Sequence, residues 1–290
     1  MRITLKQLSV FNAVAKTSSV SKAADSIALS QSATSMSLAE LENHLGAPLF
    51  HRHGKRLQLN DYGRWLQPKV HQLLQQALEI EHSANSAFLQ GHLKISASST
   101  IGNYLVPAMI GEFAKTHPQV EIDLSVGNTE QVIDDMLHLR ADIGLIEGPC
   151  HTQQLSCQPW RTDSLKVFSR PDHPLADKKK VSANMMTDES WILRESGSGT
   201  REIFSLACQG IMSNLKVKLE LGNSEAIKQA VKTGLGLGCL SELALASEIK
   251  HKELRVLNTP ELKLTRELSI VQTRNIHQSV LLKEFKLHIG

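Results

Sequence analysis

The stretch LSQSATSMSLAELENHLGAPLFHR, residues 29–52, decides the fold of the first third of the chain. Ser30 can cap a helix over residues 31–45, and Gly46 can end it. Three leucines at helical spacing form the buried stripe of this helix: Leu38, Leu41 and Leu45. The first turns carry small polar side chains instead, so they can approach another molecule while the later turns anchor the helix.

The flanking sequence supplies two earlier helices and a hairpin. An apolar face over residues 5–15 predicts the first helix, and Ser21 can cap a second, short one rich in alanine. Residues 50–59 predict a short basic hairpin that turns at Gly54. Two helices joined by a tight turn and followed by a basic hairpin are the layout of a winged helix-turn-helix, a DNA-binding fold.

In such a fold, the start of the third helix and the hairpin face DNA. Gln31 can pair bidentately with adenine, and serine or threonine hydroxyls can bond bases or phosphates. Basic hairpin side chains suit phosphate or minor-groove contact. The candidate DNA-contacting residues are Ser30, Gln31, Ser32, Thr34, Ser35, Arg52, Lys55 and Arg56. The alternative is a solvated polar helix end beside a basic turn.

A long helix should follow, because no helix breaker occurs between Pro68 and Gly91. Apolar residues recur there in a narrow stripe with alternating spacings of three and four, a pattern typical of a helix that pairs with another helix. The candidate dimerisation residues are Leu66, Val70, Leu73, Ala77, Ile80 and Ala84. The alternative is a core helix of the preceding domain. We therefore expect a DNA-binding domain over residues 1–60 and a dimerising linker helix over 61–90.

From Gly91 onward, strands alternate with helices, which predicts an α/β region of mostly parallel strands. The expected strands are 93–98, 120–126, 142–146, 165–168, 191–194, 217–221, 236–240 and 267–273. The expected helices are 101–115, 129–139, 200–209, 225–233, 241–249 and 278–288.

Charge and cysteine usage agree with a DNA-binding protein of the cell interior. Residues 1–90 hold nine Lys/Arg and six Asp/Glu, an excess of three that equals the net charge of the whole chain. Positive charge confined to one end suits a polyanion-binding domain on a neutral body. The four cysteines form no C-x-x-C pair, so we expect buried thiols, with a zinc site or redox switch as the alternative. Without a signal peptide or membrane span, the chain is expected to be cytoplasmic.

Several segments of the first domain resemble the LysR-type transcriptional regulators: Ala23-Ala24, Leu29–Ser35, Leu38–Glu42, Leu45–Arg52 and Leu59–Gly63. Ser32 stands where the common LysR pattern has proline, which leaves the operator sequence open. Segments further along resemble the YeiE branch of that family: Ser98–Tyr104, Ile143–Cys150, Trp191–Glu202 and Glu220–Lys228.

The resemblance implies an α+β winged helix-turn-helix with a long linker helix, followed by an α/β two-lobed sensor like a periplasmic binding protein. The sensor would be residues 91–290, with lobe I about 91–160 and 267–290 and lobe II about 161–266. The resemblance also implies double-stranded promoter DNA as a partner, self-association as a dimer or tetramer, and RNA polymerase as a further candidate partner. No cofactor is expected, only a small oxyanion effector, and for the YeiE branch that effector is sulfite.

Two strand-to-helix turns carry the hydroxyls and amides that such an effector needs. Residues 98–100 end one strand and begin a helix, and residues 194–200 repeat the device with two glycines. Helix starts present free N–H groups and a positive dipole to an anion. The candidate effector-binding residues are Ser98, Ser99, Thr100, Glu147, Arg194, Ser196, Ser198, Gly199 and Thr200. For each turn alone, simple helix capping is the alternative.

Glu147 stands out because a carboxylate beside an anion pocket needs compensation, from a proton on the ligand or from Arg194. A solvent-facing glutamate at a strand end is the alternative for this residue. The sequence holds no G-x-S-x-G, H-E-x-x-H or Walker A motif, so an enzyme is disfavoured. A pure solute-binding protein would leave residues 1–90 unexplained. An amino-acid-like carboxylate remains an alternative effector.

Overall fold

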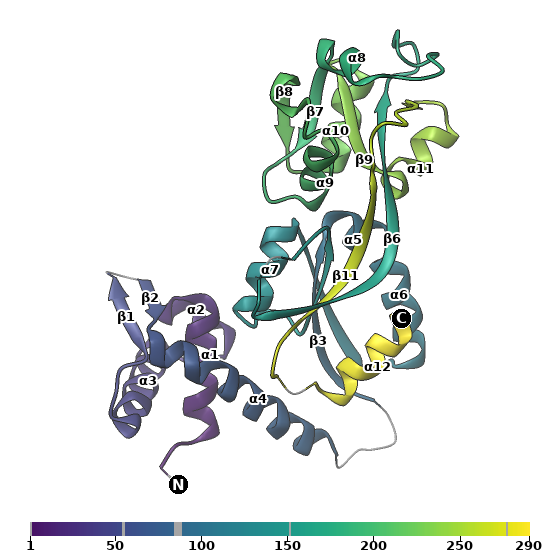
Figure 1. Cartoon of the computed structure of the whole chain (residues 1–290). Coiled ribbons are helices and arrows are strands. Elements are labelled where there is room, and N and C mark those ends of the chain that lie inside the picture. The colour runs from purple at the N-terminus through teal and green to yellow at the C-terminus, as the bar shows by residue number, and fades with distance from the viewer. Residues whose placement is uncertain (1, 54–55, 84–88, 151, 277) are drawn as a thin grey trace.

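We analysed a computed structural model of the whole chain, which describes residues 2–53, 56–83, 89–150, 152–276 and 278–290. Three parts follow one another in Figure 1: a small head, a long helix that runs under the sensor, and a sensor of two stacked lobes. No helix among the described residues has both the length and the apolar character to cross a bilayer.

The head is a winged helix-turn-helix, as predicted. Its elements are α1 (Leu5–Thr17), α2 (Val20–Ser26), α3 (Gln31–Leu45), and the antiparallel hairpin of β1 (Phe50–His53) and β2 (Arg56–Leu59). Its core joins helices and hairpin, because the fully buried Phe11 ring lies 5.7 Å from that of Phe50. The predicted turn at Gly54 lies outside the described residues.

The ends of α3 are those expected from the sequence, but the start of α2 is not. Ser30 accepts the Ala33 N–H at 3.2 Å, and Gly46 ends the helix with φ +71°. Helix α2 is capped by Ser19 instead of Ser21, through a bond from the Lys22 N–H. The prediction was wrong because α1 ends in a left-handed turn at Ser18, which brings the chain into the second helix two residues early.

The linker helix α4 (Asp61–Ser83) divides its apolar residues between two surroundings. Val70 is buried in the core of the head and Leu66 packs against it, whereas Leu73 and Leu78 are 44% and 45% exposed. Ala84 lies outside the described residues. The first half of the stripe thus serves the head, as a core helix would, and only the second half is open to another helix.

The sensor contains one continuous mixed sheet with the strand order β4-β3-β5-β11-β6-β9-β7-β8. Lobe I contains β3 (Gly91–Ser98), α5 (Ser99–Tyr104), α6 (Val106–Thr116), β4 (Val120–Gly127), α7 (Thr129–Leu137), β5 (Ile143–Glu147) and α12 (Val280–Ile289). Lobe II contains α8 (Ala183–Asp188), β7 (Ser190–Arg194), α9 (Gly199–Ala207), β8 (Lys216–Leu221), α10 (Ser224–Lys232), β9 (Leu237–Ser241), α11 (Glu242–Lys250) and β10 (Arg255–Val256).

Two long strands, β6 (Leu155–Ser169) and β11 (Thr265–Thr273), run antiparallel through both lobes (Figure 1). Within each lobe the central pairings are parallel, as expected, but every pairing of β6 and β11 is antiparallel. Only residues 165–168 of β6 were predicted as a strand. The first half of β6 contains Pro159 at a register shift and alternates poorly between buried and exposed positions, so the pattern did not indicate a strand.

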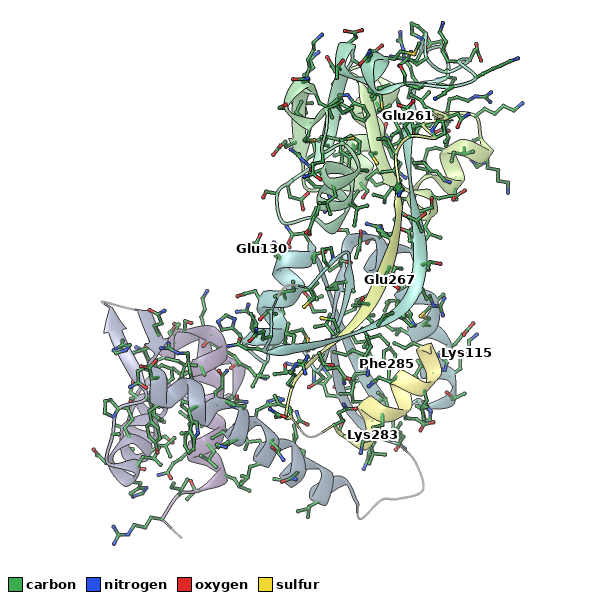
Figure 2. All side chains as sticks on the ribbon, in the orientation of Figure 1. Lys115, Glu130, Glu261, Glu267, Lys283 and Phe285 are labelled. Atoms are coloured by element: carbon green, nitrogen blue, oxygen red, sulfur yellow. The ribbon has the colours of Figure 1, made fainter. Side chains whose placement is uncertain are left out.

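Each lobe has a core of its own. In lobe I, the Phe113 ring meets that of Phe285 on α12 edge-on at 5.2 Å (Phe285 is labelled in Figure 2). In lobe II, Trp191 packs on Phe204.

Of the four free cysteines, two are buried and two are half-buried, which only partly matches the expected buried thiols. The described residues contain no cluster of three metal-ligating side chains.

Candidate functional site: a DNA-reading helix and an inter-lobe polar cluster

The start of α3 presents polar side chains outward. Ser30, Gln31, Ser32 and Ser35 are exposed, and the Ser30 and Ser32 hydroxyls lie 3.0 Å apart. Met36 beside them is 64% exposed. Because the leucines of α3 are anchored in the core of the head, these side chains stand on a rigid support, as base-reading residues require.

Thr34 corrects one of the predicted DNA contacts. It is fully buried, and its hydroxyl donates to the Ser30 carbonyl at 3.0 Å. Its side chain therefore holds the first turn of α3 together and does not face outward with its neighbours. In the hairpin, Arg52 lies on β1 and Arg56 on β2. Lys55 lies outside the described residues.

The predicted effector-binding turns meet where the two lobes touch. The Thr129 hydroxyl, at the start of α7, donates to the Glu147 carbonyl at 2.9 Å and accepts the Gly199 N–H at 3.2 Å. The Glu130 N–H donates to the Gly197 carbonyl, and Figure 2 labels Glu130 where α7 faces the upper lobe. A Cβ on Gly199 would lie 1.7 Å from the Glu147 carbonyl oxygen, so only glycine allows this approach.

Glu147 forms part of a buried ion-pair network centred on Arg266, which the sequence analysis did not single out. The Arg266 guanidinium, with its side chain fully enclosed, lies 2.5 Å from Glu147 and 2.6 Å from Asp163. It also donates to the hydroxyls of Thr200 at 2.9 Å and Thr100 at 3.1 Å. We call Thr100, Glu147, Asp163, Thr200 and Arg266 the Arg266 cluster. It joins both lobes and both long strands.

Glu147 accepts from both helix starts as well. The Thr100 N–H donates to one carboxylate oxygen at 2.5 Å and the Thr200 hydroxyl to the other at 3.0 Å. Burial opposes ionisation of Glu147, but Arg266 and the Thr100 bonds outweigh it and hold the pKa of this carboxyl below its usual range. The compensation expected from Arg194 therefore comes chiefly from Arg266, and the solvent-facing alternative for Glu147 is wrong.

Arg194 lies beside the Arg266 cluster, in the region where the two lobes touch, which we call the seam. It is 2% exposed, and its guanidinium donates two hydrogen bonds to the carboxylate of its neighbour Glu195, at 2.7 and 2.9 Å. Arg194 also contacts lobe I, because its guanidinium donates to the Ser99 hydroxyl at 3.3 Å. That hydroxyl donates in turn to the Gly127 carbonyl. An anion could gain this guanidinium only in competition with Glu195.

The remaining predicted residues differ in availability. Ser98 is 1% exposed, and its hydroxyl has no hydrogen-bond partner within the described part of the chain. Ser198 is also buried, whereas Ser196 is exposed. The two pockets described in this structure lie elsewhere, between head and sensor, and none of these serines lines them. Neither of these two pockets therefore lies at the Arg266 cluster.

Arg266 escaped the sequence analysis because the expected last strand began at Glu267. In the structure β11 begins at Thr265, so Arg266 is an inward-facing charge between two exposed neighbours. A lone arginine at a buried position of a strand is the signal that could have found it, since such a charge must be paired. Asp163, its partner on β6, lies two residues before the start of the predicted strand 165–168.

Two family models together match almost the whole chain. The bacterial regulatory helix-turn-helix protein, lysR family, matches residues 5–64, and the LysR substrate binding domain matches residues 86–289. The first range covers the head, and the second covers both lobes with the Arg266 cluster.

Individual proteins give the same result. The uncharacterized HTH-type transcriptional regulator YeiE of Escherichia coli (strain K12) is 44% identical over 285 residues, 98% of this chain and 96% of that protein. The regulatory domain of CcmR from Synechocystis PCC6803, solved in complex with 2-PG, is 34% identical with a TM-score of 0.63, covering 69% of this chain and 96% of that one.

A full-length structure extends the match in fold to the head. A full-length, singly substituted OxyR from Pseudomonas aeruginosa is 22% identical with a TM-score of 0.76, covering 100% of this chain and 94% of that one. The relatives are transcriptional regulators, not enzymes. With its winged helix-turn-helix and its two-lobed effector-binding domain, the chain belongs to the LysR family of DNA-binding transcriptional regulators.

Proposed function

We propose that this regulator senses a small oxyanion, sulfite first among the candidates, between its two lobes. The observation that carries the proposal is the meeting of two strand-to-helix turns, from different lobes, on one buried carboxylate and one buried arginine. The Ser98 hydroxyl, buried without a described partner, adds an unused donor at the same turn. Hydroxyls, amides and a guanidinium are the groups that bind oxyanions most strongly.

Glu147 defines which oxyanion can join this cluster. Its ionised carboxylate repels a full dianion, whereas a ligand that carries a proton can donate it to Glu147. Sulfite is partly protonated near neutral pH and sulfate is not, so Glu147 would favour sulfite over sulfate. A ligand must also compete with Glu147 for the Thr100 N–H and the Thr200 hydroxyl, so binding and rearrangement of the seam are linked.

That linkage would carry the signal to DNA. The effector shifts the lobes between arrangements only by its differential affinity for them, and the linker helix connects lobe I to the head. We further propose that the exposed half of α4 pairs with a second copy, so that two heads reach two half-sites of one operator. A change in the lobes would then alter the spacing of the heads.

Calorimetry on the full chain tests the effector. We expect sulfite to bind wild type more tightly than sulfate, and Glu147→Gln to narrow that ratio because the repelling charge is gone. Thr100→Ala should weaken sulfite binding by roughly tenfold, the loss of one hydrogen bond to a charged group. Equal binding of both anions to wild type would remove the role of Glu147. Tight binding of an amino-acid-like carboxylate, with no response to sulfite, would replace sulfite by that class.

A further inference from the structure

A cavity lies away from the contact between the lobes, where the head and the linker helix pass under lobe I. Its volume is about 970 Å³, within the range of small-molecule sites. Its walls come from α1 and α4 on one side, and from the start of β3, residues 140–142 and α12 on the other. A ligand in this cavity would touch the DNA-reading head and the sensor at once.

The charges that line this cavity are predominantly positive. Lys6, Lys16 and Lys94 line it, and none of their ammonium groups forms an ion pair with the part of the chain that the structure describes. Arg140 is occupied by Asp134 and Asp135, and His92 by Asp123. Asp142 is the one carboxylate among the described lining residues. An excess of cations in a partly closed space favours an anion.

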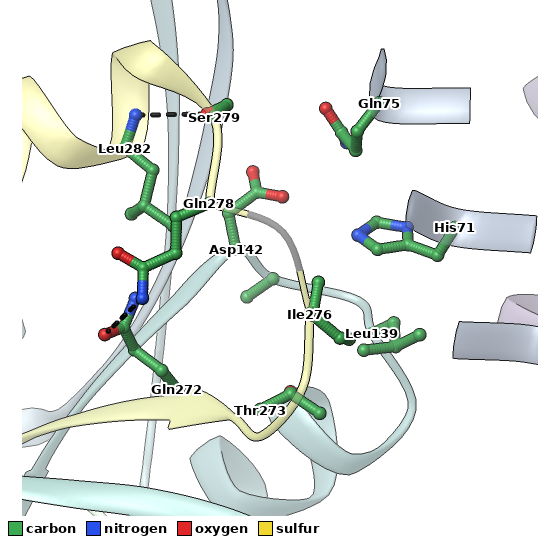
Figure 3. Close-up of a pocket in the computed structure, with 11 residues that line it drawn as sticks. His71, Gln75, Leu139, Asp142, Gln272, Thr273, Ile276, Gln278, Ser279 and Leu282 are labelled. Carbon is green, nitrogen blue, oxygen red and sulfur yellow. Dashed lines mark hydrogen bonds between the residues drawn. The ribbon is translucent and has the colours of Figure 1, made fainter. Parts of the chain in front are cut away.

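Lys16 is the group that most needs an anion. Burial and the nearby charge of Lys94 lower its pKa from 10.5 to about 8, although Asp142 acts in the opposite direction. Burial and Lys16 together lower the pKa of His71 to about 4, so this ring is neutral near pH 7. Figure 3 shows the Asp142 carboxylate directed toward His71 and Gln75 of α4. The Asp142 carboxylate therefore faces α4 as well as Lys16, so it neutralises the positive charge of Lys16 only in part.

Two further features describe the ligand. Asn12 lies one turn before Lys16 on α1 and lines the same cavity, and its side-chain oxygen has no partner among the described residues. Its amide can turn to donate to an anion. Apolar side chains also line the cavity: Leu5, Leu74, Ala77, Leu78, Leu89, Val280 and Leu281. The cavity thus offers both cationic and apolar groups to a ligand.

We propose that this cavity binds an organic anion with an apolar body, its charged group on Lys16 and Asn12 and its body along α4. The site is separate from the Arg266 cluster and independent of the sulfite proposal. A ligand there would stabilise one orientation of the head against lobe I, and so act on DNA binding from a second position.

Calorimetry with octanoate on the full chain tests the site, with 1-octanol as the uncharged probe of the same length. We expect one octanoate to bind per chain. Octanol should bind wild type at least about tenfold more weakly than octanoate does, and octanoate should bind Lys16→Met at least about tenfold more weakly than wild type, since each change removes one charge-assisted contact. Lys115→Met, an exposed lysine on α6 labelled in Figure 2, is the matched control and should bind as wild type. Val280→Asp, which places a negative charge among the apolar lining residues on α12, should also weaken octanoate binding.

Protonation gives a second, independent readout. The bound anion raises the pKa of Lys16, which is about 8 in the free protein. Octanoate binding at pH 8 should therefore take up as much as about half a proton per chain in wild type and none in Lys16→Met, measured as the dependence of the heat on the buffer. Equal binding of octanol and octanoate, an unchanged affinity in Lys16→Met, or no heat at about 1 mM octanoate would overturn the proposal. So would dissociation of an oligomer by octanoate in sedimentation, because the cavity would then be an interface between copies. Sulfite binding should be unaffected by Lys16→Met, which separates the two proposals.

Discussion

Arg266 sets the chemistry of the seam between the lobes, because one enclosed guanidinium contacts two carboxylates and two hydroxyls. Glu147→Gln leaves Arg266 paired with Asp163, but it removes the negative charge that Arg266, the Thr100 N–H and the Thr200 hydroxyl contact. We therefore expect Glu147→Gln to lower the free energy of unfolding by about 1–3 kcal/mol at pH 7, the loss of hydrogen bonds to a charged group. Glu267→Gln, an exposed neighbour of Arg266 on β11 (Figure 2), is the matched control and should change little.

The pH dependence of that loss follows from the lowered pKa of Glu147. A depressed carboxyl pKa contributes stability above the ordinary value of 4.5, and this contribution disappears as the pH falls through the lower value of the folded state. The stability difference between wild type and Glu147→Gln should therefore be constant from about pH 6 to pH 8 and shrink below about pH 4.5. Chemical denaturation across this range measures it, and a difference that grows toward acid pH would contradict the assignment.

Gly199 tests the closeness of the two lobes. An alanine Cβ there would collide with the Glu147 carbonyl oxygen, so α9 must move away from β5. We expect Gly199→Ala to cost about 1–3 kcal/mol and to enlarge the sensor in small-angle scattering. Gly210→Ala is the control, because nothing lies within 4 Å of its Cβ position. Identical scattering and stability for both variants would show that the seam does not hold the lobes closed.

Among single residues, the sequence identified the turns that meet between the lobes better than the contacts they make there. The turns at residues 98–100 and 194–200, and Glu147 itself, were identified because hydroxyls, glycines and an acid stand at strand ends. Arg266 was missed because the end of a strand is the least certain feature of a pattern. Thr34 was assigned outward although its hydroxyl bonds its own helix, which sequence spacing alone does not reveal.

Among the elements, α4 offers the sharpest contrast between two neighbouring apolar positions. Val70 is 3% exposed in the core of the head, whereas Leu73 is 44% exposed. Leu73→Asp should leave the head folded and separate the proposed dimer, because the charge would be buried only in the pair. Val70→Asp should unfold the head itself. Sedimentation and circular dichroism distinguish the two, and an intact oligomer for Leu73→Asp would remove α4 as the interface.

The first turn of helix α3 is the part expected to read bases. Gln31 is exposed at its first turn, next to the capping Ser30. Gln31→Ala should cost about 1–3 kcal/mol on specific DNA and little on random DNA, because base contacts carry sequence discrimination. Competition binding on the two kinds of DNA at one salt concentration measures this. An equal loss on both would mean that Gln31 contacts the backbone of DNA, not its bases.

The elements themselves followed from the sequence where their patterns were regular. The head and the parallel strands of each lobe were predicted from caps, spacing and alternation, and they are present. The first half of β6 and the two-residue β10 were not, because Pro159 interrupts one and the other is too short to show a pattern. Both depend on pairing with distant strands, which local patterns do not contain.

For the whole molecule, sequence patterns gave the order of the parts but not how they touch. The polar contacts between the lobes and the junction of head with lobe I join residues far apart in the chain. One such contact is the bond from the Gln67 side chain to the His138 carbonyl at 3.3 Å. These junctions are where an effector can act on the heads, since a signal needs an element with two arrangements.

The central claim, that an oxyanion between the lobes controls DNA binding, is tested most directly by the affinity of the full chain for DNA. DNA fragments selected by the protein from a random pool supply the operator, and fluorescence anisotropy gives the Kd with and without the anion. Saturating sulfite should change this Kd by about fivefold or more, the usual size of allosteric coupling, while sulfate should leave it unchanged. An operator Kd that is the same with sulfite, with sulfate and with neither would contradict control of DNA binding by the anion.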